Sequence, residues 1–406
     1  MLELAVGLPA AGALAVTLLQ RRRSLAVVGG LCLGGLALAA ALSGQGRSED
    51  FFGIRLALPP PLLAVLVATF LTGALAVLLV PPGAARLPML WSVLSGLTAV
   101  TAIAVLTDPL LMALVVLLVA CGQAALPALR PFVERMRAPA FGGLALAFGL
   151  ILAGGVDAVP LQKVAGLAVV LGFAAMIGLA PYLQALDPRE PAPASPMAWL
   201  AFLGPGIAVA MAVRVAPTLS ADAGTAYTEV LLAFGLFNIA VGAAGSHFSK
   251  QASDGWRYAL LGDWGLVLAG FGLLTPGGAG AAYLLLLSIL LVRLPLYLMA
   301  RPALVRGDLA PLSAWTLVLA AALAGAAPFL GFPARLLLLR SATVVAWPLA
   351  LVLAVAMLAW LPQSIRLART IGRPTRLGGA VLLLLGLLSA GIGLYPAPLL
   401  RYLGAG

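Results

Sequence analysis

The sequence predicts an all-α polytopic membrane protein. Hydrophobic residues make up 63% of the 406 residues and charged residues only 9%. Most charges fall between long apolar runs, such as residues 279–292, rather than inside them. A helix of about 20 apolar residues crosses a bilayer, and a chain built from such runs cannot be a soluble globular protein.

Fourteen apolar segments, ended by charges, Pro or Gly, follow one another along the chain. They lie near residues 4–19, 24–42, 61–80, 88–106, 109–128, 139–156, 161–183, 196–215, 226–246, 257–274, 277–300, 311–332, 342–362 and 377–397. Only the polar and then Pro-rich connection Ser43–Pro60 and the Pro-rich connection Asp187–Pro196 are long. Neither is large enough to form a soluble domain, so the chain is expected to be helical throughout.

The basic residues predict the orientation of these spans. Sixteen of the 24 Lys and Arg residues lie in the connections that follow the odd-numbered spans. By the positive-inside rule these connections are cytoplasmic, so both termini face the periplasm or the exterior of a cytoplasmic (inner) membrane. The basic residues that give the net charge of +11 lie between apolar spans. This placement favours the lipid bilayer rather than nucleic acid as the partner. The first span has no small-residue cleavage site and is expected to be a retained helix.

Motifs for soluble chemistry are absent from the sequence. It has no phosphate loop, no Cys/His metal spacing and no Ser–His arrangement. Its two cysteines lie in predicted spans and suggest neither a disulfide framework nor a metal site. We therefore expect no catalytic site, no metal and no cofactor in this chain.

Three stretches carry a resemblance to a known family. They are GFAAMIGLAPYLQ at 172–184 with SPMAWL at 195–200, SDGWRYALLGDWGLVLAG at 253–270, and AGAAPFLGFPARLLLL at 324–339. In order and spacing they resemble the antiporter-like membrane subunits of respiratory complex I. That family is shared with Mrp cation/proton antiporters and with membrane-bound hydrogenase and formate hydrogenlyase complexes. The resemblance covers roughly residues 85–370.

The resemblance implies two inverted five-helix repeats, spans 4–8 and spans 9–13, each with a broken helix. The expected parts are a three-helix segment (1–84), the first repeat (85–215), the second repeat (216–370) and a C-terminal helix (371–406). The breaks are expected near Pro181 in span 7, and between Pro328 and Pro333 in span 12. Proline removes a backbone donor, which frees carbonyl groups that can bind water or a cation.

The first repeat departs from the family pattern. The resemblance places a proton-relay glutamate in the fifth helix and lysines in the seventh and eighth helices. Here Val116 or Leu117 stands at the glutamate position, Met176 at the first lysine position and Gly206 near the second. The first half-channel is therefore expected to have lost its titratable groups, and these residues to cluster in a dry region.

The second repeat keeps charge at the family positions, but as arginine. Arg293 falls at the lysine of the eleventh helix and Arg335 at that of the twelfth. A charged side chain facing lipid costs at least ~2.5 kcal/mol, so both should point inward and meet a carboxylate or freed carbonyls. Asp263 is the first candidate and Glu229 the second, while a neighbouring subunit could supply another. Because arginine stays protonated, it organises water and holds anions rather than carrying protons.

His247 and Lys250 complete the candidates for an ion pathway. They lie at the end of the ninth span on the predicted cytoplasmic side. An ordinary interfacial pair is the favoured interpretation of these two side chains, ahead of a role in an ion pathway. For Asp263, too, the alternative to a carrier role is that it simply neutralises Arg293.

The leading functional hypothesis is an antiporter-like, proton-translocating-type subunit of a complex I-related energy-converting complex. Its partners would be other membrane and peripheral subunits. Those partners would carry the iron-sulfur clusters and a quinone or another redox centre. The alternatives are a self-standing secondary cation/proton transporter and a purely structural membrane scaffold. A coupled transporter needs titratable groups at midplane, and the first repeat has none.

Overall fold

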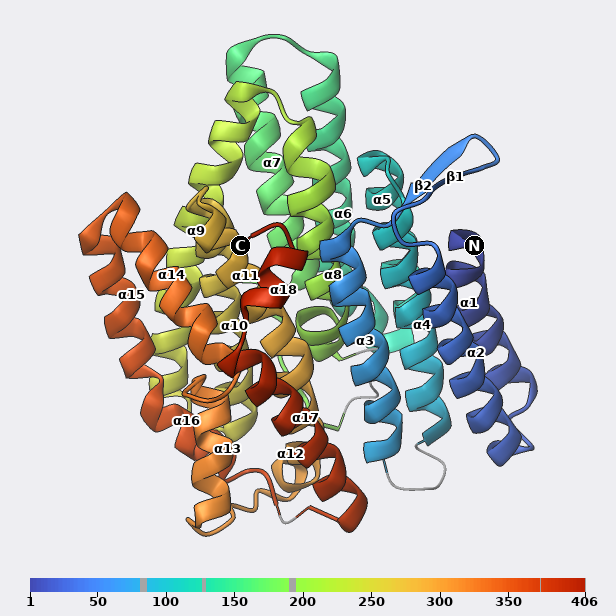
Figure 1. The fold of residues 1–406 in the computed structure, drawn as a ribbon, viewed down its shortest axis with the longest axis vertical. Helices are drawn as coiled ribbons and strands as arrows, with labels where there is room; N and C mark the ends of the chain where they lie inside the picture. Colours follow the sequence, from blue (N-terminus) through green and yellow to red (C-terminus); the bar gives the residue numbers. More distant parts are fainter. Residues whose placement is uncertain (81–85, 126–128, 190–194, 373, 406) are drawn as a thin grey trace. The chain divides into compact units, whose positions relative to one another are not determined.

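The computed structural model describes residues 1–80, 86–125, 129–189, 195–372 and 374–405. Its longer helices run side by side within each part of the molecule (Figure 1). Their bounds are α1 Leu2–Leu18, α2 Arg23–Ser43, α3 Pro60–Leu79, α4 Arg86–Val105, α5 Pro109–Ala125, α6 Leu129–Gly155, α7 Val159–Ile177, α8 Gly204–Ala210, α9 Ala221–Phe248, α10 Ala252–Gly272, α11 Pro276–Ser288, α12 Leu294–Arg306, α13 Ala314–Ala324, α14 Gly331–Val345, α15 Trp347–Ala359, α16 Leu361–Ala368, α17 Arg376–Leu394 and α18 Ala397–Tyr402.

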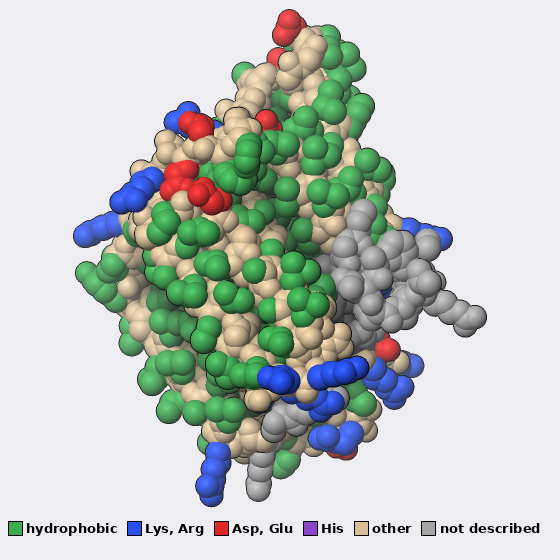
Figure 2. Space-filling model, turned by 90° about the vertical axis from the view of Figure 1, so that its right-hand side faces the viewer, with side chains coloured by type: hydrophobic (Ala, Val, Ile, Leu, Met, Phe, Trp, Pro, Cys, Tyr) green, Lys and Arg blue, Asp and Glu red, His purple; other side chains and the backbone are tan. Residues whose placement is uncertain are grey.

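Each of the fourteen expected spans overlaps one or more helical segments, but α14 occupies residues 331–345, most of which were expected to connect spans 12 and 13. In the described part of the chain, ten helical segments are long and apolar enough to cross a membrane. Three of the other expected spans are shorter apolar helices, and the last is α10, which carries charges. Figure 2 shows one face on which hydrophobic side chains spread over the middle, while Lys and Arg lie mainly at the margins. Helices suit this environment because they satisfy their own backbone hydrogen bonds.

The chain divides into two compact units. Unit 1 comprises Met1–Gly178 and Glu190–Tyr227, and unit 2 comprises Leu179–Arg189 and Thr228–Gly406. In unit 1, α6 and α7 approach closely through glycines. A Cβ on Gly142 would lie 2.4 Å from the backbone nitrogen of Met176, and one on Gly172 would lie 2.5 Å from that of Leu146. Such small residues allow membrane helices to pack backbone to backbone.

A short β-hairpin interrupts the expected all-helical pattern. Strands β1 (Ser48–Phe51) and β2 (Ile54–Ala57) pair antiparallel, with Phe51 opposite Ile54. The hairpin follows α2 in unit 1 (Figure 1). Arg214 Nη2 donates to the carbonyl of Ala57 at 2.7 Å, and this bond ties the hairpin to the end of the eighth span. The apolar pattern could not reveal it, because the connection Ser43–Pro60 is simply polar.

The seventh span ends at its break instead of continuing beyond it. Helix α7 stops at Ile177, Gly178 adopts φ +85°, and a cis peptide bond precedes Pro181. The expectation of a span reaching residue 183 was therefore wrong at this end. Residues 179–189 contain no helix, and residues 190–194 of the expected Pro-rich loop lie outside the described residues. Glycine tolerates the left-handed conformation that turns the chain out of the helix.

The twelfth span is a helix broken into two halves. Helix α13 ends at Ala324, Gly325 adopts φ +61°, a cis bond precedes Pro328, and α14 begins at Gly331. The break therefore covers residues 325–330, slightly earlier than expected. Pro333 lies within the first turn of α14, where its missing N–H leaves no helical bond unmade.

Candidate functional site: an aspartate between two arginines

The buried charges of unit 2 converge on one carboxylate. Asp263 lies in the middle of α10, Arg293 at the end of the eleventh span's π-helical turn η5 (Ile289–Arg293), and Arg335 in the first turns of α14. Arg293 Nε donates to Asp263 Oδ2 at 2.5 Å. Arg335 Nη2 donates to Asp263 Oδ1 at 3.5 Å. The pairing expected from the cost of a lone arginine is present, and Asp263 provides it.

The three side chains are largely shielded from solvent. The side-chain exposures are 7% for Asp263, 6% for Arg293 and 11% for Arg335. One carboxylate faces two guanidinium groups, so the cluster carries one excess positive charge. Buried charges persist only when they are paired or hydrogen-bonded, which makes this arrangement a candidate functional site.

A local irregularity of the eleventh span positions Arg293. The chain runs from α11 through the π turn η5 into α12, and Pro295 lies in the first turn of α12. Proline cannot donate to the carbonyl four residues earlier, and its ring clashes with that carbonyl, so the regular helix is disrupted just before it. Single π turns inside helices are frequent at functional sites.

The broken twelfth span positions Arg335. A Cβ on Gly325 would lie 2.7 Å from Arg335 Nη1, so the guanidinium sits directly against the end of α13. The positive φ of Gly325 and this contact both require a residue without a side chain. The C-terminal end of a helix carries partial negative charge, which stabilises a nearby cation.

Two N–H groups of the cluster's arginines make no hydrogen bond to the described residues. In the described part of the chain, Arg293 Nη1 and Arg335 Nε are buried without a hydrogen-bond partner. Buried donors in native proteins are nearly always satisfied by protein groups, water or ions. The arrangement can therefore bind water molecules or an anionic group beside Asp263.

Side chains from other helices hold both breaks, and the sequence alone did not reveal them. Asn238 Oδ1, in α9, accepts the N–H of Ala180 at 2.9 Å. Ser389 Oγ, in α17, accepts the N–H of Leu330 at 3.1 Å. Both side chains are fully buried. The signal that could have found them is a lone polar residue inside an apolar run.

We expect Asn238→Leu and Ser389→Ala each to lower the free energy of unfolding by about 1–3 kcal/mol, because each leaves a buried backbone N–H unsatisfied. Thermal unfolding of the purified protein in detergent measures this. Ser95→Ala is the matched control, since its hydroxyl donates within its own helix, to the carbonyl of Ser92. Equal melting temperatures for Ser389→Ala and Ser95→Ala would contradict the prediction.

Comparison with solved structures identifies the fold. No protein-family model matches the chain, and no curated protein matches it in sequence. A chain of the membrane-bound sulfane sulfur reductase, an archaeal respiratory membrane complex, has a TM-score of 0.79 at 15% identity, covering 98% of this chain and 77% of that one. A chain of the Mrp complex from Dietzia sp. DQ12-45-1b has 0.78 at 18%, covering 99% and 96%. A chain of respiratory complex I from Thermus thermophilus has 0.76 at 20%, covering 99% and 97%.

The chain has the fold of these chains from respiratory and Mrp membrane complexes. The resemblance carried by the three sequence stretches therefore holds for the architecture, and the protein is an integral membrane protein. In this fold the cluster joins the tenth, eleventh and twelfth spans. The contribution of each residue to ion movement stays a prediction.

The other candidates of the second repeat lie outside the cluster. Glu229 is exposed on α9, and no ion pair joins it to Arg293 or Arg335 among the described residues. His247 and Lys250 are exposed at and just beyond the end of α9. Lys250 lines a polar cavity of about 320 Å³ that Arg366 also lines, whereas His247 does not. Arg366 donates to the carbonyl of Lys250 at 2.6 Å.

The uncharged positions of the first repeat lie on helices of unit 1. Val116, Met176 and Gly206 are buried, and Leu117 is half-buried. Met176 and Leu117 approach the neighbouring glycines 142 and 143 of α6, whereas Gly206 packs against a valine of α4. The expected dryness of this region stays a prediction.

Proposed function

We propose that this chain is an antiporter-like membrane subunit of a complex I-related energy-converting assembly. In it, the Asp263–Arg293–Arg335 cluster is the ion-handling centre. The redox chemistry resides on partner subunits, which carry iron-sulfur clusters and a quinone or another redox centre. The observation that carries the proposal is a buried aspartate held between a π turn and a broken helix, in a fold shared with chains of respiratory and Mrp complexes.

The unequal contacts of Asp263 assign different tasks to the two arginines. Arg293 holds the carboxylate at 2.5 Å, while Arg335 contacts it at 3.5 Å from the second half of the broken span. The longer contact is the one that can open or tighten as α14 moves. Asp263 is then the group that exchanges the ion, and Arg335 changes the charge that surrounds it. Arginine remains charged throughout, which suits an electrostatic role rather than proton carriage.

A line of buried polar groups supports access from the polar cavity. Thr370 lines that cavity, and its Oγ1 accepts the indole N–H of Trp256 at 3.0 Å. Beside Trp256, Gln363 packs against Gly255, and further along α10 the Trp360 ring packs against Gly262, next to Asp263. Gln363 Nε2 and Trp360 Nε1 are buried without a hydrogen-bond partner in the described part of the chain. Water molecules at these donors would connect the cavity with the cluster.

The two repeats differ in charge under this proposal. If spans 4–8 correspond in order to spans 9–13, then α5 is the counterpart of α10, and α7 is the counterpart of the broken twelfth span. Val116 then lies on the helix that corresponds to the one carrying Asp263, while Met176 lies before the break of its span and Arg335 lies after the break of the twelfth span. Ion movement would use the second repeat alone.

The second candidate function is a structural scaffold without ion movement, which the loss of charge in the first repeat favours. Gentle solubilisation of native membranes and identification of the co-purifying subunits is the first test. We expect a stable set of partners that includes redox subunits. A lone chain would favour a self-standing transporter instead.

Reconstituting the purified assembly in vesicles is the second test. Electron transfer should drive movement of H⁺ or Na⁺, measured with a dye for each ion. Comparing the wild-type assembly with one that carries Asp263→Asn assigns that movement to this chain. If the Asp263→Asn assembly moved ions at the wild-type rate, this chain would not carry the ion, and the structural scaffold would be the better assignment.

A further inference from the structure

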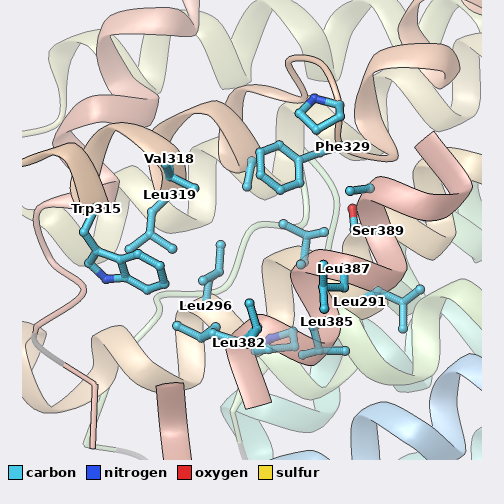
Figure 3. Close-up of a pocket in the computed structure, with 17 residues that line it drawn as sticks. Leu291, Leu296, Trp315, Val318, Leu319, Phe329, Leu382, Leu385, Leu387 and Ser389 are labelled. Carbon is cyan, nitrogen blue, oxygen red and sulfur yellow. The ribbon is translucent and has the colours of Figure 1, made fainter. Parts of the chain in front are cut away.

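An apolar groove of about 290 Å³ opens in unit 2 beside the candidate site. We call it the α13–α17 groove. Figure 3 shows Trp315 at one end, and Phe329 with Ser389 at the other. Its walls come from the η5–α12 segment, α13, the break after α13, and α17. The labelled lining residues are Leu291, Leu296, Trp315, Val318, Leu319, Phe329, Leu382, Leu385, Leu387 and Ser389.

The lining indicates a hydrocarbon occupant. Among the described residues that line the groove, Ser389 supplies the only side-chain polar group apart from the indole of Trp315, and its Oγ already accepts the N–H of Leu330. The outer rim is exposed, with Leu383 at 63%, Leu387 at 64% and Val318 at 49%. An exposed groove at the depth of apolar spans meets lipid, and it holds no arrangement of donors and acceptors for a polar ligand.

The Trp315 end of the groove has the features of the headgroup region. Trp315 follows the first residue of α13 and is 39% exposed. Tryptophan is enriched where the bilayer meets water, because its ring is apolar and its N–H is polar. From Trp315 the groove runs along the helices toward the break, in the direction that an acyl chain takes into the bilayer.

Several arginines lie at helix ends close in the chain to the start of α13 or of α17. Arg301 and Arg306 lie in the second half of α12, Arg369 follows α16, Arg376 begins α17, and Asp308 lies in the connection between α12 and α13. Arg306 pairs with Asp308 at 2.8 Å, while the Nε groups of Arg301 and Arg369 donate to backbone carbonyls. Arg376 is exposed, and no partner for it is found among the described residues. Six residues of helix, about 9 Å, separate it from Leu382 in the groove.

We propose that the α13–α17 groove binds one acyl chain of an anionic phospholipid whose phosphate pairs with Arg376. The groove is lined by Leu291 and Val292 next to Arg293, and by Phe329 in the break that leads to Arg335. The bound chain therefore braces both elements that position the cluster. Arginine and phosphate form charge-assisted hydrogen bonds, which explains the preference for an anionic headgroup.

The chain offers a matched pair of glycines for the test. Gly386 lines the groove, and a Cβ there would meet no atom within 4 Å. Gly391 lies on the same helix, has the same open space, and is not among the groove's lining residues. Gly386→Phe fills the groove without a backbone clash, and Gly391→Phe makes the same chemical change outside it.

Native mass spectrometry of the full chain, in micelles doped with phosphatidylglycerol or phosphatidylcholine, measures the bound lipid. We expect wild type to retain phosphatidylglycerol about fivefold better, the effect of one basic residue at a membrane surface. Arg376→Gln should remove that preference. Gly386→Phe should abolish retention, and Gly391→Phe should leave it at the wild-type level.

Two outcomes would overturn the proposal. One is equal lipid retention by the two phenylalanine variants. The other is loss of a co-purifying polypeptide from Gly386→Phe with lipid retention unchanged, which would assign the groove to a partner's helix. A second measurement avoids the glycine variants: phosphatidylglycerol with brominated acyl chains should quench the fluorescence of Trp315, read as the difference between wild type and Trp315→Phe. Equal quenching in wild type and in Trp315→Phe would also contradict the proposed lipid site.

Discussion

Asp263→Leu is expected to destabilise the protein by about 3–5 kcal/mol, because it leaves two buried guanidinium groups without their carboxylate. Both arginines contact Asp263, and in the described part of the chain no other carboxylate forms an ion pair with them. Thermal or denaturant unfolding of the purified protein in detergent measures the loss. Asp263→Asn retains the shape and an acceptor oxygen, and its loss should be smaller.

Glu229→Leu is the matched control for this experiment. It also removes one carboxylate from a membrane helix, but Glu229 is exposed on α9. Its effect on stability should be small. Adding Arg293→Leu to Asp263→Leu should recover part of the lost stability, since it removes one of the uncompensated charges. If Asp263→Leu and Glu229→Leu unfolded at the same temperature, the cluster would not stabilise the fold.

Arg335→Leu is expected to reduce coupled ion movement roughly tenfold or more while the assembly remains intact. Losing one charge-assisted hydrogen bond costs about 1.5–3 kcal/mol, and about 1.4 kcal/mol corresponds to tenfold in rate. The cluster carries one excess positive charge, so removing Arg335 leaves a neutral Asp263–Arg293 pair. Stability should therefore fall much less than in Asp263→Leu, which separates the effect on transport from an effect on folding.

Two further variants sharpen this experiment in reconstituted vesicles. Arg335→Lys keeps the positive charge, so assembly and part of the ion movement should persist with a changed pH profile, since lysine can release its proton. Arg340→Leu removes an exposed arginine from the same helix and should behave as wild type. Unchanged ion movement in Arg335→Leu would remove the half-channel hypothesis and favour the structural scaffold.

Much of the architecture follows from local properties of the sequence. A span needs a fixed length of apolar residues, and proline ends regular helical bonding wherever it lies. These two facts located the fourteen spans and the breaks near Pro181 and Pro328. They also singled out Arg293 and Arg335, because a charged residue within an apolar run is conspicuous without any knowledge of its neighbours.

Other features depend on residues far apart in the chain. Asp263 is 30 residues from Arg293 and 72 from Arg335, and composition gave no means to prefer it decisively over Glu229. The π turn before Pro295, the end of α7 at Ile177 and the hairpin also escaped the hydropathy pattern, because kinks, helix ends and strand pairs leave little trace in it.

The sequence by itself determined that this is a helical membrane protein with broken spans and two conspicuous arginines. Burial of apolar length and the missing N–H of proline act locally, so they can be read from neighbouring residues. Only the tertiary structure decided that Asp263 joins both arginines, that Asn238 and Ser389 hold the breaks, and that a groove opens beside them. Those features arise from packing between distant helices, where a pair forms only if both backbones place its members within reach.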